Sequence, residues 1–489
     1  SGADRVLYAP SILSSGNNEV GKASLGTDFT RTLPSDGVYT LAIRNTSDTA
    51  VTYDVQVNDI TPTSVTNSGL GVLYEGDISV AGEVDEYTFT ANAGTFVYFD
   101  GQEDNNSTRV RLYNPDNTLF SSNYQPNANY GPLLLQQTGT YKLEAYGSNS
   151  NATGGYKFQL LDLEAATTLS LNTDQNILLN PKEIKAYKFT GKVGQQVWFD
   201  GLNTSNPNIT AYLYNPNGRQ LYSHSDLLND VAIQTLSQEG TYYLVLSSNS
   251  TSDETASFRL LDDIGATTID LDTEITGNFG TSQREANIYK FNGSEGQRLY
   301  FDRNDGDSRN YYYLYNKNGK RIFWEELDND RELAELPYDG EYTLVFSGRG
   351  RTNNNYDLRI VSPEPTTASY TVGETVSSSI SELGEEDTYT FSGTVGQQLW
   401  FDSLSASNIS AYLYSPTNVQ VWGQGAGSDK EPFTLTSEGT YRLVIDGSSD
   451  NVGDYSFRLL DLASATEVDL DAEITGNFGT SQREANIYK

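Results

Sequence analysis

The chain has 489 residues, with 65 acidic residues against 31 basic ones, a formal net charge of −34 and no cysteine. This charge excludes nucleic acid and anionic membranes as partners, because both repel a polyanion. The lack of cysteine excludes a disulfide scaffold, and no apolar run approaches the ~18 residues of a membrane-spanning helix.

A repeat of about 100 residues runs through the chain. The motif Gly-x-Tyr-x-Leu begins at residues 37, 139, 240, 340 and 439, at intervals of 102, 101, 100 and 99 residues. A repeat of this length is a whole domain, because a solenoid turn has only ~20–50 residues. The sequence predicts a partial module over 1–62, four complete modules over 63–163, 164–263, 264–363 and 364–463, and the opening strands of a further module over 464–489.

The module over 164–263 shows the predicted elements most clearly. Short runs that alternate polar with apolar or aromatic residues indicate β-strands, here 186–189, 195–200, 209–214, 220–222, 240–246 and 257–261. Turn residues separate these runs, as in Asn215-Pro216-Asn217-Gly218. No segment has sustained helical spacing of apolar residues, so the pattern predicts an all-β sandwich.

Further markers recur in register with the first. They are Tyr-x-Phe (at Tyr87), Gly-x-x-x-aromatic-Phe-Asp (Gly94–Asp100) and Leu-Tyr-Asn-Pro (Leu112–Pro115), each with counterparts in the later modules. In this order the markers resemble the bacterial pre-peptidase C-terminal domain family. The resemblance implies a tandem array of jelly-roll-like β-sandwich domains of about 100 residues each. It also implies a bacterial protein that is extracellular or on the cell surface, and some relatives bind calcium, collagen or other polymers.

Four aspartates are candidate calcium ligands, because hard cations take carboxylate oxygens and the chain is acidic. Asp100, Asp200, Asp302 and Asp402 close the same predicted strand in four modules. The alternative interpretation is that each carboxylate caps a turn by accepting backbone N–H groups. Apart from calcium, the sequence predicts no cofactor.

The chain offers no catalytic constellation. Its single histidine, His224, has no counterpart in the other modules, and no hydrolase or phosphate-loop motif is present. We therefore expect a protein that is not an enzyme. Trp324 and Trp422 are specific to their modules and could form a platform for a polysaccharide or matrix polymer; edge packing is the alternative.

The two ends are both parts of a module. Val6–Pro10 aligns with Arg111–Pro115, so the first predicted segment begins in mid-module, and the 17 residues Glu473–Lys489 are identical to Glu274–Lys290. One account is a longer array that contains this chain. The other is strand addition, in which the tail of one subunit completes the incomplete first module of the next; its candidate residues are Glu473, Ile474, Phe478, Ile487 and Tyr488.

These features predict an extracellular structural protein, a stalk or filament of tandem β-sandwich modules that associates with itself into a fibre or longer array. The alternative is a set of carbohydrate- or matrix-binding accessory modules of a larger secreted enzyme or adhesin.

Overall fold

The computed structural model describes residues 11–14, 19–22, 31, 33–45, 49–50, 52–57, 63–64, 69–203, 205, 207–333, 335–350, 354–447, 451–479 and 483–489. It divides into two compact units, the first comprising Ser1–Val193, Ser205–Leu228 and Leu236–Phe258, and the second comprising Gly194–Thr204, Asn229–Thr235 and Arg259–Lys489. Within the described residues, no helix has the length and apolar character that crossing a membrane requires.

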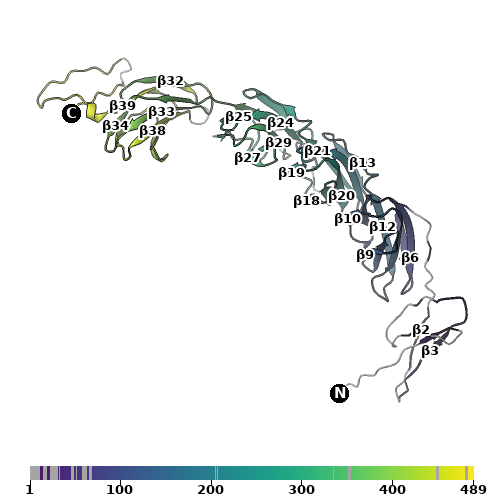
Figure 1. The fold of residues 1–489 in the computed structure, drawn as a ribbon. Coiled ribbons are helices and arrows are strands. Elements are labelled where there is room, and N and C mark those ends of the chain that lie inside the picture. Colours follow the sequence, from purple (N-terminus) through teal and green to yellow (C-terminus); the bar gives the residue numbers. More distant parts are fainter. Residues whose placement is uncertain are drawn as a thin grey trace. The chain divides into compact units, whose positions relative to one another are not determined.

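The all-β prediction is confirmed. The described residues form 39 strands and one short 3-10 helix, η1 (Leu462–Ser464). A pair of sheets, one of five strands and one of four, recurs four times along the chain, and Figure 1 labels many of their strands. We number the repeats one to six after the six segments predicted from the sequence.

Repeat one contributes a three-stranded sheet in the order β2-β1-β3, formed by β1 (Ser11–Leu13), β2 (Glu19–Lys22) and β3 (Thr40–Ala42). In repeat two the five-stranded sheet has the order β4-β6-β11-β8-β9, formed by β4 (Thr63–Ser64), β6 (Val84–Ala91), β11 (Gly139–Gly147), β8 (Thr108–Tyr113) and β9 (Leu119–Tyr124). Its four-stranded sheet has the order β10-β7-β12-β5, formed by β10 (Tyr130–Leu134), β7 (Phe96–Gly101), β12 (Gly154–Asp162) and β5 (Leu73–Ile78).

Repeat three has its five-stranded sheet in the first unit, formed in order by β13 (Thr167–Thr168), β15 (Ile184–Gly191), β20 (Gly240–Ser248), β17 (Ile209–Tyr214) and β18 (Gln220–His224). Also there, β14 (Gln175–Leu179) pairs antiparallel with β21 (Glu254–Asp262). In the second unit, β16 (Gln196–Gly201) pairs antiparallel with β19 (Val231–Thr235).

Repeats four and five follow the same plan in the second unit. The five-stranded sheet of repeat four is formed in order by β22 (Thr267–Thr268), β24 (Ala286–Gly293), β29 (Gly340–Ser347), β26 (Tyr311–Asn316) and β27 (Arg321–Glu326), and its four-stranded sheet by β23 (Glu274–Asn278), β30 (Asn355–Val361), β25 (Leu299–Asp305) and β28 (Arg331–Leu333). In repeat five the five-stranded sheet is formed in order by β31 (Thr366–Ser369), β33 (Glu386–Gly393), β38 (Gly439–Asp446), β35 (Ser410–Tyr414) and β36 (Gln420–Gly425). Its four-stranded sheet is formed in order by β32 (Val376–Ile380), β39 (Gly453–Asp461), β34 (Gln398–Ala406) and β37 (Lys430–Thr434).

Two of the sequence markers meet in the core of each sandwich. In repeat four, the Tyr342 ring of Gly-x-Tyr stacks on the Phe291 ring of Tyr-x-Phe, with centroids 5.6 Å apart. The Tyr342 hydroxyl donates to the carbonyl oxygen of Tyr338 at 2.7 Å, which satisfies the only polar atom of the buried side chain. Equivalent stacks join Phe89 to Tyr141, Phe189 to Tyr242 and Phe391 to Tyr441.

The glycine of the same marker is required by close packing. In repeat two, Gly139 has a φ of +149°, and a Cβ added there would lie 2.8 Å from Cβ of Pro115. Pro115 ends the Leu-Tyr-Asn-Pro marker, so a side chain at position 139 would collide with that turn. The markers therefore recur together because their residues contact one another.

Candidate functional site: the joints between repeats

Buried clusters of polar and aromatic residues lie where consecutive repeats meet. We call these contacts the 2–3 joint, in the first unit, and the 3–4 and 4–5 joints, in the second unit. Each connection has only four residues, namely 163–166, 263–266 and 362–365, between the last strand of one repeat and the first strand of the next. Four residues span at most ~14 Å, so neighbouring repeats are held close.

The 2–3 joint is mainly apolar. A buried cluster spans it, formed by Phe96, Tyr98 and Leu163 from repeat two and by Ile184, Tyr214, Tyr243 and Val245 from repeat three. The hydroxyls of Tyr98 and Tyr214 lie 3.3 Å apart, and Asn129 Nδ2 donates to Ser247 Oγ at 3.0 Å. Each large apolar side chain that is fully buried stabilises a contact by ~1.5–3 kcal/mol. This cluster therefore holds repeats two and three together.

The 3–4 joint combines an apolar cluster with buried hydrogen bonds. The cluster contains Trp198, Ile233 and Leu261 from repeat three and Ala286, Tyr315 and Val345 from repeat four. Gln196 is buried there, and its amide is satisfied by both partners: Nε2 donates to the carbonyl oxygen of Asn316 at 2.8 Å, and Oε1 accepts from Thr343 Oγ1 at 2.9 Å. A buried amide with both ends bonded fixes orientation, because any shift leaves a polar group unsatisfied.

The repeated aspartate lies at the centre of this joint. Asp200 Oδ2 accepts from Arg259 Nε at 2.8 Å and from the backbone N–H of Ala286 at 3.1 Å. Arg259 Nη2 donates in turn to the carbonyl oxygen of Ala286 at 2.8 Å. Asp200 and Arg259 thus bind both backbone groups of the first residue of β24, so the strand that opens repeat four is anchored by repeat three.

The same arrangement recurs where the tail meets repeat five. Asp402 Oδ2 accepts from Arg458 Nε at 2.6 Å and from the backbone N–H of Ala485 at 3.1 Å. Arg458 Nη2 donates to the carbonyl oxygen of Ala485 at 2.8 Å. Ala485 occupies the place in the tail that Ala286 occupies in repeat four, so the joint is a repeated device.

Burial shifts the pKa of these carboxyl groups upward. Burial raises the pKa of Asp100 to about 6, against hydrogen bonds from Gln159, Gln102 and the backbone N–H of Ile184 in repeat three. Burial, followed by repulsion from Asp230, raises the pKa of Asp200, and Arg259 opposes the rise. Burial also raises the pKa of Asp402. Ionised carboxylates in these joints therefore depend on their cationic or amide partners.

The predicted calcium ligands have other partners in the structure. Asp200 and Asp402 pair with arginines, Asp302 pairs with Arg359 at 3.1 Å, and Asp100 accepts from two glutamines. Within the part of the chain that the structure describes, no three histidine, cysteine or acidic residues gather closely enough to hold a metal ion. Calcium binding at the four aspartates stays a prediction. Asp200 and Asp402 accept backbone N–H groups, but those groups belong to Ala286 and Ala485 and not to the turn that follows the strand, as the alternative interpretation expected.

The sequence contains a repeated residue that could have indicated the partner of each aspartate. Each partner directly precedes an apolar pair near the end of the last long strand of its repeat. The four partners are Gln159, Arg259, Arg359 and Arg458. In the antiparallel sheets these residues lie directly opposite the aspartates, as in the pairings of Gln159 with Asp100 and of Arg458 with Asp402. A cation or amide at fixed spacing from a repeated carboxylate could have indicated the pairs.

The prediction that Trp422 belongs to a ligand platform is wrong. Its side chain is 7% exposed and lies in the core of repeat five, 5.4 Å from the Phe401 ring centroid. Trp324, in contrast, is 48% exposed on β27, and its ring centroid lies 5.6 Å from that of Tyr311 in an edge-on arrangement. A ligand platform at Trp324 stays a prediction.

The tail residues Glu473, Ile474, Phe478, Ile487 and Tyr488 lie in the segment that is identical to the opening of repeat four. Thr466 pairs in parallel with Tyr488, as Thr267 pairs with Tyr289 in repeat four. The apolar residues of the tail are nevertheless exposed. Ile474 and Phe478 are 50% and 64% exposed, whereas Ile275 and Phe279, in the identical segment of repeat four, are 4% and 0% exposed.

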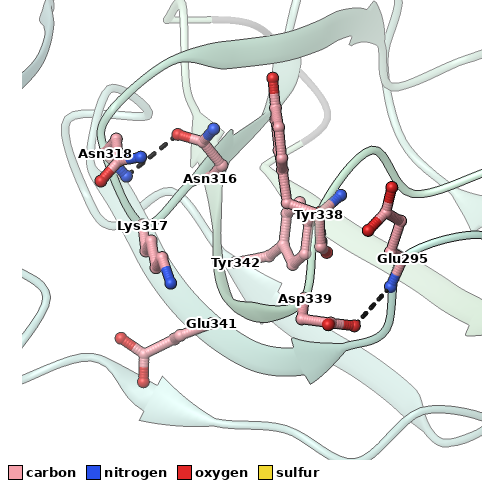
Figure 2. Close-up of a pocket in the computed structure, with 8 residues that line it drawn as sticks. All are labelled: Glu295, Asn316, Lys317, Asn318, Tyr338, Asp339, Glu341 and Tyr342. Carbon is pink, nitrogen blue, oxygen red and sulfur yellow. Dashed lines mark hydrogen bonds between the residues drawn. The ribbon is translucent and has the colours of Figure 1, made fainter.

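One pocket of about 240 Å³ lies in repeat four, with Glu295, Asn316, Lys317, Asn318, Tyr338, Asp339, Glu341 and Tyr342 around it (Figure 2). Lys317 replaces the proline of the Leu-Tyr-Asn-Pro marker. Asp339 Oδ1 accepts from the backbone N–H of Glu295 at 2.8 Å and closes one side. The lining contains none of the residues that the sequence predicted as a site.

Comparison with known proteins leaves the chain without a family. No family model matches it, and no curated protein does. Similar solved structures include the CUB1-EGF-CUB2 domain of human MASP-1/3, at 8% identity over 38% of this chain and 99% of that chain, with a TM-score of 0.13. They also include the CUB1-EGF-CUB2 domains of rat MASP-1, at 9% identity over 61% of this chain and 100% of that chain, with a TM-score of 0.15. Another is the Bacteroides ovatus protein SGBP-B in complex with a mixed-linkage heptasaccharide, at 10% identity over 83% of this chain and 97% of that chain, with a TM-score of 0.09. TM-scores this low carry no argument about fold or function, and the resemblance to the pre-peptidase C-terminal family stays a prediction.

Proposed function

We propose that this chain is an extracellular, non-enzymatic structural protein of a bacterial cell surface, in which tandem β-sandwich repeats are docked to form a stalk or filament. The observation that carries the proposal is the repetition of one joint: Asp200 and Arg259 bind Ala286 as Asp402 and Arg458 bind Ala485. A chain whose repeats only had to be tethered would need no buried hydrogen-bonded contacts between them. A role in resisting force or in fixing a spacing does need them.

Small-angle X-ray scattering of the purified chain tests this role. A docked array gives a maximum dimension that stays constant between low and high salt, because buried contacts are screened little. The matched variant inserts a flexible Gly/Ser segment between Asp263 and Ile264, which separates repeats three and four without changing either joint surface. The proposal predicts a broader distance distribution for that variant alone. A natural chain that already scatters as freely jointed beads would contradict it.

We further propose that stalks associate end to end, with a second copy of the chain covering the exposed tail. In repeat four, β30 covers the segment identical to the tail, through the pairing of Ile275 with Leu358 and of Gly277 with Tyr356. The residues at the equivalent places in repeat one, Tyr53 and Val55, are 57% and 41% exposed. In this proposal, repeat one of another copy pairs with the tail as β30 pairs with β23 in repeat four.

Sedimentation velocity over a range of concentrations tests the association. Phe478→Ser should shift the chain towards monomer, because it removes the largest apolar contact of the tail. Val395→Ser is the matched control, since Val395 is 68% exposed but lies on a turn of repeat five, outside the tail. A natural chain that is monomeric at every concentration, or equal loss in both variants, would refute strand addition.

A second candidate function rests on Trp324. Its half-exposed ring continues a row of aromatic rings through Tyr311 and Tyr313, and such rings can stack on a sugar. In this version the chain is a set of accessory modules that bind a polysaccharide or matrix polymer. Trp324→Ala should abolish retention on an insoluble polysaccharide that retains the natural chain, and unchanged retention would reject the candidate.

A further inference from the structure

The 4–5 joint differs from the other two in the residues at equivalent positions. Arg298 stands where repeat two has Phe96 and repeat three has Gln196, two residues after the glycine of the Gly-x-x-x-aromatic-Phe-Asp marker. Glu386 stands where repeats three and four have Ile184 and Ala286, three residues before Tyr-x-Phe. Charged side chains thus replace apolar or neutral ones on both sides of this joint.

A third substitution lies on the central strand of repeat five. Asp446 stands where repeats three and four have Ser247 and Ser347. Those serines bond to repeat two or three: Asn129 Nδ2 donates to Ser247 Oγ at 3.0 Å, and Ser347 Oγ donates to Asp230 Oδ2 at 2.5 Å. The corresponding residues of the 4–5 joint are Asp330 and Asp446, so two carboxylates stand at the places of these hydrogen-bonded pairs.

Two carboxylates pair with one cation at this joint, and a third carboxylate lies opposite one of them. Arg298 Nη2 lies 2.7 Å from Glu332 Oε1 in repeat four and 3.2 Å from Glu386 Oε1 in repeat five. Glu386 and Asp446 are directly opposite each other on the antiparallel strands β33 and β38. Like charges directly opposite in a sheet are destabilising, and one guanidinium cannot neutralise three carboxylates.

Two further residues near Asp446 that the structure describes do not supply the missing charge. Its cross-strand neighbour on β35 is Ser410, which is neutral. Arg442 is four residues earlier on the same face of β38, but its guanidinium lies over the Tyr414 ring and donates to Asn418. Burial, then repulsion from Glu386 and Glu332, raises the pKa of Asp446 to about 6, and Arg298 opposes the rise.

We infer that the contact between repeats four and five is a pH-responsive joint, which loosens when its carboxylates are all ionised and tightens when one of them takes up a proton. The direction follows from linkage: an acid that binds its proton more tightly in the docked state favours docking as the pH falls. The response is centred near the pKa of about 6. The inference rests on the joint itself and stands whether or not the chain serves as a stalk.

Double electron–electron resonance on the full chain tests the inference. The chain contains no cysteine, so labels attach only at introduced sites. Glu295→Cys and Val395→Cys place one label on each repeat, on equivalent exposed turns. We expect a narrow distance distribution at pH 5 and a broader one at pH 8, with the change centred near pH 6.

Two variants make the test specific. Glu386→Ala combined with Asp446→Ser installs the residues of the 3–4 joint, and its distribution should be narrow at both pH values. Arg298→Gln removes the cation that bridges Glu332 and Glu386, and its distribution at pH 8 should be broader than that of the natural joint. An equal width at pH 5 and pH 8 in the natural joint, or a pH response that persists in the double variant, would overturn the inference.

Discussion

The carboxylate of Asp200 accepts a hydrogen bond from the backbone N–H of Ala286, which lies 86 residues further along the chain and 3.1 Å away. Ala286 is the first residue of β24, and its carbonyl oxygen accepts from Arg259, the partner of the same aspartate. One ion pair of repeat three therefore holds both backbone groups of the residue that opens repeat four. The stability of repeat four should depend on a side chain that belongs to repeat three.

Replacement of Asp200 tests that dependence. Asp200→Ala leaves Ala286 without an acceptor and leaves Arg259 paired with Glu285, 3.1 Å away, so it should cost ~1.5–3 kcal/mol, as expected for lost hydrogen bonds to a charged group. Chemical denaturation measures the loss. Glu239→Gln, at an exposed position of the same repeat, should change stability by less than ~0.5 kcal/mol. Equal effects of the two variants would contradict the role of Asp200.

The identical segments provide a comparison within one chain. Phe279→Ala should destabilise repeat four by ~3–5 kcal/mol, because it empties a core site. Phe478→Ala, the same change in the same local sequence, should cost less than ~0.5 kcal/mol in dilute monomer, because that ring is 64% exposed. Thermal unfolding of both variants at low concentration measures the difference. Comparable losses would mean that the tail is packed in solution.

The two tryptophans should respond in opposite ways. Trp422→Ala removes a buried ring from the core of repeat five and should cost ~3–5 kcal/mol, whereas Trp324→Ala at the surface should stay within ~0.5 kcal/mol. Intrinsic fluorescence gives an independent check, because quenching by iodide reaches exposed rings first. Loss of the more quenchable signal in Trp422→Ala would contradict the assignment.

Much of the fold was predictable because the markers that repeat in the sequence contact one another in the structure. Phe291 and Tyr342 belong to different markers and stack in the core, and Pro115 packs on Gly139. Alternating burial along β6 follows the alternation of its sequence. For this reason, the all-β class and the four pairs of sheets could be predicted from the sequence.

The site was less predictable, and for identifiable reasons. The repeated aspartate was visible, but its partner Ala286 contributes backbone groups, which carry no signal in the sequence. The error at Trp422 is one of register. Trp422 is opposite Leu413 and corresponds to Phe323 of repeat four, opposite Leu314, whereas Trp324 is one residue further and faces the other side of its sheet. A shift of one residue along a strand reverses the face.

The pH dependence of the 2–3 joint follows from Asp100. Its pKa rises from an ordinary 3.8 to about 6 through burial, so its ionised form is disfavoured in the fold. Its contribution to stability is most favourable below pH 3.8 and is lost as the pH rises through about 6. This rise corresponds to about 3 kcal/mol.

Asp100→Asn should remove that dependence. The variant should be more stable than the natural chain at pH 8, and the difference should vanish towards pH 4. Urea denaturation at a series of pH values measures the difference, and exposed Asp174→Asn is the control. A variant that is less stable at pH 8 would show that ionised Asp100 contributes favourably to the joint.

The central claim is that consecutive repeats are docked and not merely linked. Negative-stain electron microscopy of single chains tests it most directly, through the distribution of angles between neighbouring repeats. The account predicts a narrow distribution at the 3–4 joint of the natural chain and a broad one in the Asp200→Ala variant, with the 2–3 joint unchanged. A broad distribution at every joint of the natural chain would contradict it.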